Sequence, residues 1–492
     1  MNSGKALQIH PRDNVAVALE DLSAGSSILN GCVSSAAIPQ GHKIALYDIR
    51  RGEQIVKYGC VIGHATQDIP RGALVHVENM ATNLDNAGAY RYEPVRHSLP
   101  EVSPRHFMGF RRADGRAAIR NEIWILPLVG CVNAVAQRLA CENQALVCGS
   151  VDGLYAFTHP FGCSQLGDDH ARTRKLLAAL ANHPNAAAVL VLALGCENNA
   201  LDRFKQELGF WDEERVRFLV CQDSEDELAD GAALLRQLAG YAQRFTRRRM
   251  DVRQLRVGLK CGGSDGLSGI TANPAVGCFS DLLIAHGGAT VLTEVPEMFG
   301  AESMLLNRCK DEQVFQRAVK MIERFKDYYV AHGQPVYENP SPGNKAGGIS
   351  TLEDKSCGCI QKGGCAPVED VLEYAEQLRQ NGLTLLSAPG NDLVSTTALS
   401  AAGVHMILFT TGRGTPFGAP VPTVKISSNS RLALRKPDWI DFDAGSVAQG
   451  ERLDAVGRRL MDLVLEIAGG RQTCAERNGY REISILKDGV VL

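Results

Sequence analysis

The sequence predicts an α/β protein with a small β-rich domain at the N-terminus and a large region of parallel strands with crossover helices after it. Short strand-like runs separated by glycines fill residues 4 to about 90, and this spacing favours a compact all-β fold. From residue 121 onward, apolar runs of strand length alternate with longer helical patterns, as in parallel α/β sheets. Polar motifs follow several of these runs, where the carboxyl ends of parallel strands bind ligands.

Length and composition restrict the class of protein. The 492 residues suffice for two to four domains, and 45% hydrophobic with 22% charged residues is typical of globular proteins. A formal net charge of −3 gives no basic excess for binding nucleic acid. The N-terminus lacks a signal-peptide pattern, and no apolar run reaches the roughly 18 residues that a membrane span needs. We therefore expect a cytoplasmic protein with no nucleic-acid or membrane partner.

The β-rich domain is expected over residues 1–91. Its strands are expected at 6–10, 14–19, 44–49, 54–58 and 73–77. His10 ends the first of these runs and His42 precedes the third. They are either turn histidines or groups that bind metal or carry protons, because neutral imidazole ligates metals near neutral pH. Several prolines favour extended backbone over residues 92–107, which we expect to be a linker.

The α/β region is expected to form two subdomains, 108–340 and 341–492, because a glycine-rich polar loop at 339–348 interrupts the alternation. Strands are expected at 121–128, 186–194, 216–220, 255–259, 289–292, 383–386 and 404–409, with a terminal strand or hairpin at 481–492. Helices are expected at 134–141, 171–181, 225–239, 311–330, 368–380 and 453–467.

Fifteen cysteines in a reducing compartment are expected to be core fillers, metal ligands or reactive thiols. Cys163, Cys196 and Cys261 lie beside glycines and polar side chains, in loops or at predicted strand ends. Thiolates that converge from three loops would hold an iron–sulfur cluster or one metal ion, and the alternative is three buried thiols. The Cys357–Cys365 segment does not match a zinc spacing, so we expect a flexible loop there.

Carboxylates follow two of the predicted strands. The stretch 260–269 combines a thiol, two serine hydroxyls and Asp265 with four glycines, which indicates a site and not a spacer. Glu294 and Glu297 follow the strand at 289–292. They are either a solvated pair or, for Glu294, a general base or metal ligand at a strand end.

Two cationic motifs suit the recognition of a carboxylate or phosphate. Arg413 lies between glycines after the strand at 404–409, and Lys345 lies in the 339–348 loop. Neither motif matches a Walker or dinucleotide-binding fingerprint, which argues against nucleotide binding.

Five long motifs together resemble the altronate/galactarate dehydratase family. They are GCSQLGDDH at 162–170, LGCENN at 194–199, CGGSDGLSGITANP at 261–274, TEVPEMFGAE at 293–302 and NPSPGNKAGG at 339–348. The resemblance runs from end to end, and the N-terminal domain is similar to a SAF (β-clip) domain. The first two motifs resemble the altronate branch more than the galactarate branch.

The resemblance implies dehydration of D-altronate to 2-dehydro-3-deoxy-D-gluconate in hexuronate breakdown, with Fe²⁺ or Mn²⁺ as cofactor. An iron–sulfur cluster is the alternative cofactor. The chemistry needs a base for the proton beside the carboxylate, cations for the developing enediolate and an acid for the departing hydroxyl.

The residue roles that follow from the resemblance fall into three groups. The expected metal ligands are Cys163, Cys196, Cys261 and His10, with Cys131 nearby. The expected catalytic residues are Glu294, Asp265 and His42. The expected substrate-binding residues are Lys345, Asn344, Ser341, Arg413 and Thr415.

Other functions remain open at this stage. Within the family they are galactarate dehydratase and sulfolactate sulfo-lyase. From another class, a protein that binds a sugar acid or iron without turnover fits the same motifs. The expected partner is a small-molecule sugar acid, and we expect a homo-oligomer, a dimer.

Overall fold

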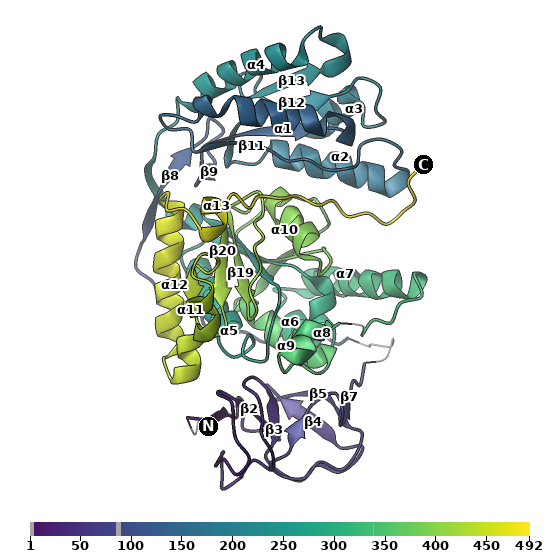
Figure 1. The fold of residues 1–492 in the computed structure, drawn as a ribbon, viewed down its shortest axis with the longest axis vertical. Helices are drawn as coiled ribbons and strands as arrows, with labels where there is room; N and C mark the ends of the chain where they lie inside the picture. Colours follow the sequence, from purple (N-terminus) through teal and green to yellow (C-terminus); the bar gives the residue numbers. More distant parts are fainter. Residues whose placement is uncertain (1–3, 85–89, 338) are drawn as a thin grey trace.

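The computed structural model describes residues 4–84, 90–337 and 339–492. Its N-terminal domain consists of two small antiparallel sheets (Figure 1, purple). The first sheet has the order β1 (Ala6–Leu7), β2 (Val15–Ala18), β3 (Lys43–Ala45) and β6 (Leu74–Val75). The second has the order β4 (Gln54–Lys57), β5 (Cys60–Ala65) and β7 (Met80–Ala81). The predicted all-β character of this domain is confirmed.

A four-stranded parallel sheet forms the next unit. Its order is β11 (Gly153–Ala156), β10 (Glu122–Pro127), β12 (Ala186–Ala193) and β13 (Val216–Val220). The helices are α1 (Asn133–Glu142), α2 (Gly167–Ala181), α3 (Leu201–Leu208) and α4 (Glu227–Ala242). Every residue of β12 is buried, because Val189 and Val191 pack with α2 and α3 while Leu190 and Leu192 pack with α1 and α4. Burial on both faces explains the uninterrupted apolar run of this strand.

A seven-stranded parallel sheet forms the centre of the molecule (Figure 1). Its order is β17 (Val368–Leu372), β18 (Gly382–Leu386), β16 (Ala289–Leu292), β15 (Arg256–Cys261), β19 (Met406–Thr411), β20 (Thr423–Ser427) and β21 (Phe442–Asp443). α5 (Ala272–Ala285) and α12 (Leu453–Ala468) cover one face, and α10 (Asp392–Ala401) covers the other. Strands from both sides of position 340 pair in this one sheet, so the boundary expected there falls inside a sheet.

The remaining elements connect or flank these sheets. A three-stranded antiparallel sheet, β14 (Arg248–Asp251), β8 (His106–Arg111) and β9 (Ala117–Ala118), lies where the two parallel units meet. The other helices are α6 (Glu302–Leu306), α7 (Glu312–Ala331), α8 (Pro342–Ala346), α9 (Leu352–Cys359), α11 (Ser430–Arg435) and α13 (Cys474–Arg477). Three of the 3₁₀ helices are η4 (Val252–Gln254), η5 (Val295–Met298) and η6 (Ile360–Gly363). Within the described residues, none of the helices has the length and apolar character to cross a membrane.

Two expected elements are wrong. The helix expected over 368–380 is instead strand β17 and an irregular loop. Val368, Val371 and Leu372 have helical spacing, but a short apolar run with that spacing also suits a buried strand at a sheet edge. The strand or hairpin expected at 481–492 is an extended tail that crosses to the second unit, where the Leu492 amide donates to the Ser164 carbonyl at 2.9 Å.

Candidate active site

The carboxyl edge of the seven-stranded sheet carries a buried polar cluster. Lys260 and Cys261 are the last two residues of β15, and because successive side chains of a strand alternate, they point to opposite faces. Lys260 reaches the first residue of α10, and Cys261 reaches η5 and α9. Glu294 enters from the loop after β16. Lysines from α9 and η6 complete the cluster.

Three lysines and three carboxylates pair within this cluster. Lys260 Nζ contacts Glu294 Oε1 and lies 3.0 Å from Asp392 Oδ1. Lys362 Nζ lies 3.4 Å from Glu294 Oε2 and 2.8 Å from Cys261 Sγ. Lys355 and Glu297 form the third pair, with 2.7 Å between Nζ and Oε1. The three positive and three negative formal charges therefore cancel. Burial of these groups is tolerated only while all of them are present, because removing one leaves a buried charge without a partner.

The two glutamates differ in proton affinity. Burial and the neighbouring Glu297 raise the pKa of Glu294 above its ordinary value, although Lys260 and Lys362 oppose this. Burial also acts to raise the pKa of Glu297, but Lys355 and the other two lysines outweigh it and hold the pKa below its ordinary value. A carboxylate pair with separated pKa values is characteristic of acid–base sites.

The backbone of Glu294 is strained. Its φ of 71° lies in the left-handed region, which a residue with a side chain adopts only at a cost. The conformation turns both carboxylate oxygens inward, where Oε2 accepts a hydrogen bond from the Cys261 amide at 3.0 Å. Strain of this kind concentrates at functional sites, and nothing in the sequence around Glu294 announces it.

One group of potential metal ligands lies in the cluster. Among the described residues, Cys261, Glu297 and Cys359 are the one set of three or more such side chains whose ligand atoms lie within 4.8 Å of one another. Cys261 Sγ is 3.0 Å from Glu297 Oε2 and 3.5 Å from Cys359 Sγ. A divalent ion with two thiolates would leave the net charge of the cluster unchanged, since a coordinated thiol loses its proton. This donor set fits Fe²⁺ and suits Mn²⁺ poorly.

Cys359 requires a correction of the sequence prediction. The segment expected to be a flexible loop instead starts within helix α9, whose eight residues are all buried, and continues into η6. The hydrogen bond with Cys261 and burial raise the pKa of Cys359 well above its ordinary value, so without a metal it is a neutral thiol. Cys357 and Cys359 form a CxC pair, but only Cys359 faces the cluster. One such cysteine has no recognisable ligand spacing, so the sequence did not reveal Cys359 as a potential ligand.

The structure does not bring the expected three-thiolate site together. Cys131, Cys163 and Cys196 are exposed, at the carboxyl edge of the four-stranded sheet. The thiol of Cys163 donates to Asn198 Oδ1 at 3.3 Å, and Cys196 Sγ accepts from an amide at 3.4 Å. Cys261 is instead buried, and its sulfur contacts the side chains of the lysine–carboxylate cluster.

His10 and His42, the two histidines of the N-terminal domain that were expected in the site, lie outside the cluster. His10 Nδ1 accepts a hydrogen bond from the Arg12 amide at 3.1 Å, and the ring packs against Gly59. His42 is buried, with its ring 5.1 Å from that of His76, and burial lowers its pKa. Neither belongs to the group of potential metal ligands, so the metal role expected for His10 has no geometric support.

The glycine-rich stretch 260–269 makes its closest contacts with the N-terminal domain. A Cβ on Gly266 would lie 1.9 Å from the Gly41 carbonyl oxygen, and one on Gly348 would lie 2.4 Å from the same atom. A Cβ on Gly269 would lie 2.2 Å from the Tyr58 hydroxyl. These glycines are required because the backbones of three segments approach one another directly.

Asp265 is held by structural hydrogen bonds. Its carboxylate accepts from the Ser268 amide at 2.9 Å, the Ser428 hydroxyl at 2.8 Å and the Asn429 side-chain amide at 3.1 Å. A carboxylate saturated in this way organises its loop, and it is a weaker candidate for the base than Glu294.

The structure places the expected substrate-binding residues in three different settings. Arg413 is exposed and lines a cavity of about 340 Å³ together with Asp265, Arg431 and Arg435. Ser341 and Asn344 form the capping box of α8, so they hold the helix that carries Lys345. Thr415 contributes its carbonyl oxygen to Lys425 Nζ at 3.2 Å.

A second buried ion network fixes the N-terminal domain to the sheet. Asp354 of α9 lies 2.7 Å from Lys43 Nζ and 2.9 Å from Lys57 Nζ, and all three side chains are at most 1% exposed. Burial lowers the pKa of Lys43 to about 8, against the opposing charge of Asp354. Glu353 of the same helix accepts hydrogen bonds from Thr82 and from the Asn83 amide. One short helix thus contacts the cluster through Lys355 and Cys359 and the N-terminal domain through its acidic residues.

Besides Cys359, sequence reasoning missed four members of the cluster: Lys260, Lys355, Lys362 and Asp392. Lys260 carried a signal, since a charged residue that follows an apolar run within a buried strand needs a buried partner. The others lie in separate segments without a shared motif.

The chain matches known protein families and individual proteins along nearly its whole length. Family models match three successive parts of the chain: "Altronate/galactarate dehydratase SAF domain" at residues 4–83, "D-galactarate dehydratase/Altronate hydrolase, second domain" at 109–243, and "D-galactarate/Altronate dehydratase, C-terminal" at 252–491. Altronate dehydratase of Escherichia coli (strain K12) is 52% identical over 494 residues, with 99% of each chain covered. Altronate dehydratase of Bacillus subtilis (strain 168) is 51% identical with the same coverage. Galactarate dehydratase (L-threo-forming) of Escherichia coli (strain K12) is 33% identical, covering 95% of this chain and 93% of that protein.

Proposed function

Because this chain belongs to the D-galactarate/altronate dehydratase family, we propose that it removes water from D-altronate to give 2-dehydro-3-deoxy-D-gluconate. The observation that carries the substrate is the identity of 52% and 51% to two altronate dehydratases over 99% of each chain, against 33% to a galactarate dehydratase. The buried lysine–carboxylate cluster supports the reaction class independently.

The reaction demands a strong base in a cationic environment. The C2–H bond and the C3–O bond break, which releases water and leaves an enol. The enol then rearranges to the C2 ketone. The C2 proton is weakly acidic because the adjacent carboxylate is already anionic. A base with a raised pKa and fixed positive charges near the enediolate lower this barrier.

Glu294 is the proposed base. The structure supports this role through its raised pKa, its fixed backbone and its contact with two lysines. In the proposed cycle, Glu294 takes the C2 proton while Lys260 donates a proton to the departing hydroxide, so that water leaves. The contact between Glu294 and Lys260 then returns the proton to the lysine, and both groups regain their starting charge.

Access to the base is proposed through the start of α10. Asp392 is 33% exposed at its side chain although it is bound to the buried Lys260. Arg413 lies on the same edge, with its amide bonded to the Gly263 carbonyl at 3.1 Å. We propose that Arg413 binds the substrate carboxylate or a distal hydroxyl, with Lys345 close by on α8.

The proposed metal site consists of Cys261, Glu297 and Cys359. Fe²⁺ bound there would supply a positive charge for the carboxylate and enediolate oxygens. A mononuclear ferrous ion and an iron–sulfur cluster differ plainly in their visible and EPR spectra, so protein purified without oxygen distinguishes the two cofactors.

Side-by-side turnover tests the substrate. Purified protein, reconstituted with Fe²⁺ without oxygen, is incubated with altronate, galactarate or sulfolactate, and keto acid and sulfite are measured. The proposal requires a kcat/KM for altronate well above the other two. Equal or faster turnover of galactarate, release of sulfite, or altronate binding without keto acid would each refute it. Light scattering on the same sample measures the proposed homodimer.

A further inference from the structure

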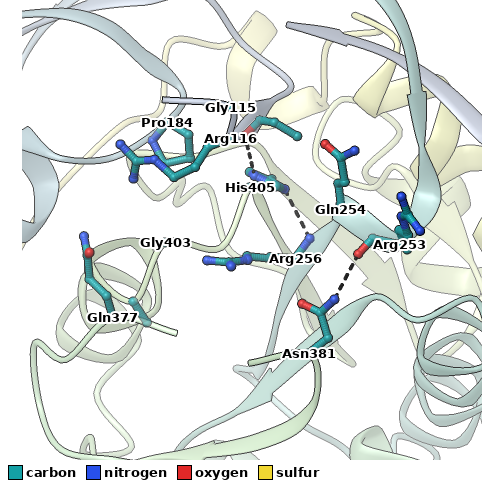
Figure 2. A pocket seen from close by; sticks show the side chains of 12 residues that line it. Gly115, Arg116, Pro184, Arg253, Gln254, Arg256, Gln377, Asn381, Gly403 and His405 are labelled. Carbon is teal, nitrogen blue, oxygen red and sulfur yellow. Dashed lines mark hydrogen bonds between the residues drawn. The ribbon is translucent and has the colours of Figure 1, made fainter. Parts of the chain in front are cut away.

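A second polar pocket lies at the opposite edge of the seven-stranded sheet. It has a volume of about 280 Å³, close to the lower end of the range for small-molecule sites, roughly 300 Å³. It is formed where the β8–β9 hairpin of the antiparallel sheet and the loop before β12 meet the amino ends of β15 and β19 (Figure 2). The candidate active site lies at the carboxyl ends of the same strands, so the two sites are separate.

The lining of this pocket is strongly basic. Arg116, Arg253 and Arg256 line it together with His405, whose pKa burial lowers to about 3, so the charge comes from the arginines, and none of the described lining residues is acidic. Arg116 is neutralised by Asp114 at 2.7 Å, and Arg253 lies 3.7 Å from Asp251. The guanidinium of Arg256 has no hydrogen bond or ion pair with any other described side chain or carbonyl, although the residue is half-buried. Figure 2 shows it extending from the strand toward Gly403, with no dashed line at its end.

The protein behind the pocket adds further positive charge. Arg112 is buried and Arg215 half-buried, and among the described residues their guanidinium hydrogen bonds go only to carbonyl and amide oxygens. Burial and the nearby Arg215 lower the pKa of Arg112 to about 9, and burial and Arg116 lower that of Arg215 to about 10. Burial and Arg116 also lower the pKa of Arg256. Arg112, Arg215 and Arg256 have no ion pair with any described residue, and the repulsion between these guanidinium groups is relieved by an added anion.

We propose that this pocket is a binding site for a small multivalent oxyanion, a ligand that carries a phosphate group or several carboxylates. Arg256 binds the anion through its planar fork, which matches the geometry of both groups. Arg253, which is exposed, closes the rim, and Gln254 offers a side-chain amide to hydroxyls of a larger ligand. Because two units of the protein line the pocket, binding there stabilises their junction.

Isothermal titration of the full-length protein tests this proposal. The probes are inorganic phosphate, pyrophosphate and citrate, with chloride at matched ionic strength as the reference. We expect saturable binding of one anion per chain for at least one probe, and the tighter class identifies the natural ligand as phosphate-bearing or as a polycarboxylate. Binding no stronger than that of chloride for all three probes would overturn the proposal.

Three variants locate the binding. Arg256→Gln is expected to weaken binding at least tenfold, and Arg253→Gln, at an exposed position that does not threaten folding, severalfold. Arg236→Gln on α4 replaces another exposed arginine outside the pocket and should leave the affinity unchanged within twofold. Dehydration of altronate should persist in all three, because the pocket lies away from the cluster. Wild-type affinity in both pocket variants, or an equal loss in Arg236→Gln, would refute the assignment.

Discussion

Asp354→Asn is expected to release the N-terminal domain from the sheet. The substitution keeps the shape of the side chain but removes the charge that pairs with Lys43 and Lys57, both fully buried. Loss of one partner from a buried ion pair costs about 3–5 kcal/mol, since the remaining charge is left without compensation. At about 1.4 kcal/mol per factor of ten, this raises the population of the undocked state more than 100-fold.

Hydrogen exchange measures this loss directly. The Asn83 amide donates across the domain boundary to Glu353 Oε1 at 2.8 Å, so its protection reports on docking. We expect protection at Asn83 to fall about 100-fold or more in Asp354→Asn. The matched control is Asp462→Asn, which removes an exposed pair with Arg105 and should cost less than about 1 kcal/mol. Unchanged protection at Asn83 in Asp354→Asn would show that the buried network does not hold the domains together.

Three further predictions concern the site and its supports. Cys359→Ala is expected to lose bound iron, measured by metal analysis, whereas Cys163→Ala retains it; iron loss only in the second variant would restore the ligand set expected from the sequence. Because burial and Glu297 raise the pKa of Glu294, the base is protonated and inactive up to a higher pH than an ordinary glutamate. The acid limb of the kcat/KM profile should therefore lie above the usual glutamate range, and an acid limb at the ordinary value would contradict this. Glu294→Gln should lower kcat by about 10²–10⁴. Gly266→Ala is expected to destabilise the protein in urea unfolding, because its Cβ meets a carbonyl oxygen. The control Gly240→Ala, in open space on α4, should be neutral or stabilising by up to about 1 kcal/mol. Equal effects of the two substitutions would refute the steric argument.

The fold was predictable where burial leaves a periodic pattern. β12 is buried on both faces and its sequence is an unbroken apolar run. α12 has the spacing of apolar residues that is typical of an amphipathic helix. Edge strands are harder, because only part of their surface is covered. β17 shows this: its apolar residues recur at a spacing that also fits a helix, and only its pairing with β18 decides between the two.

The candidate site was predictable only in part, because its members share no segment. Glu294 and Cys261 could be identified from their place after apolar strands. Their partners Lys362 and Cys359 lie about 100 residues further along the chain than Cys261, as the 101 and 98 positions between them show. Single-chain patterns report what is near in sequence, whereas charge compensation in a buried site is decided by what is near in space.

The cysteines illustrate the consequence of that difference. Exposed thiols in polar loops, such as Cys163 and Cys196, look more like ligands in a sequence than Cys359, which lies in a buried helix. A thiol at a solvent-exposed sheet edge needs no partner, but a sulfur enclosed by lysines and carboxylates alters the charge balance of everything around it. A buried thiol enclosed by lysines and carboxylates is therefore the better place for a metal that binds sulfur, and Lys362 at 2.8 Å from Cys261 Sγ marks that position.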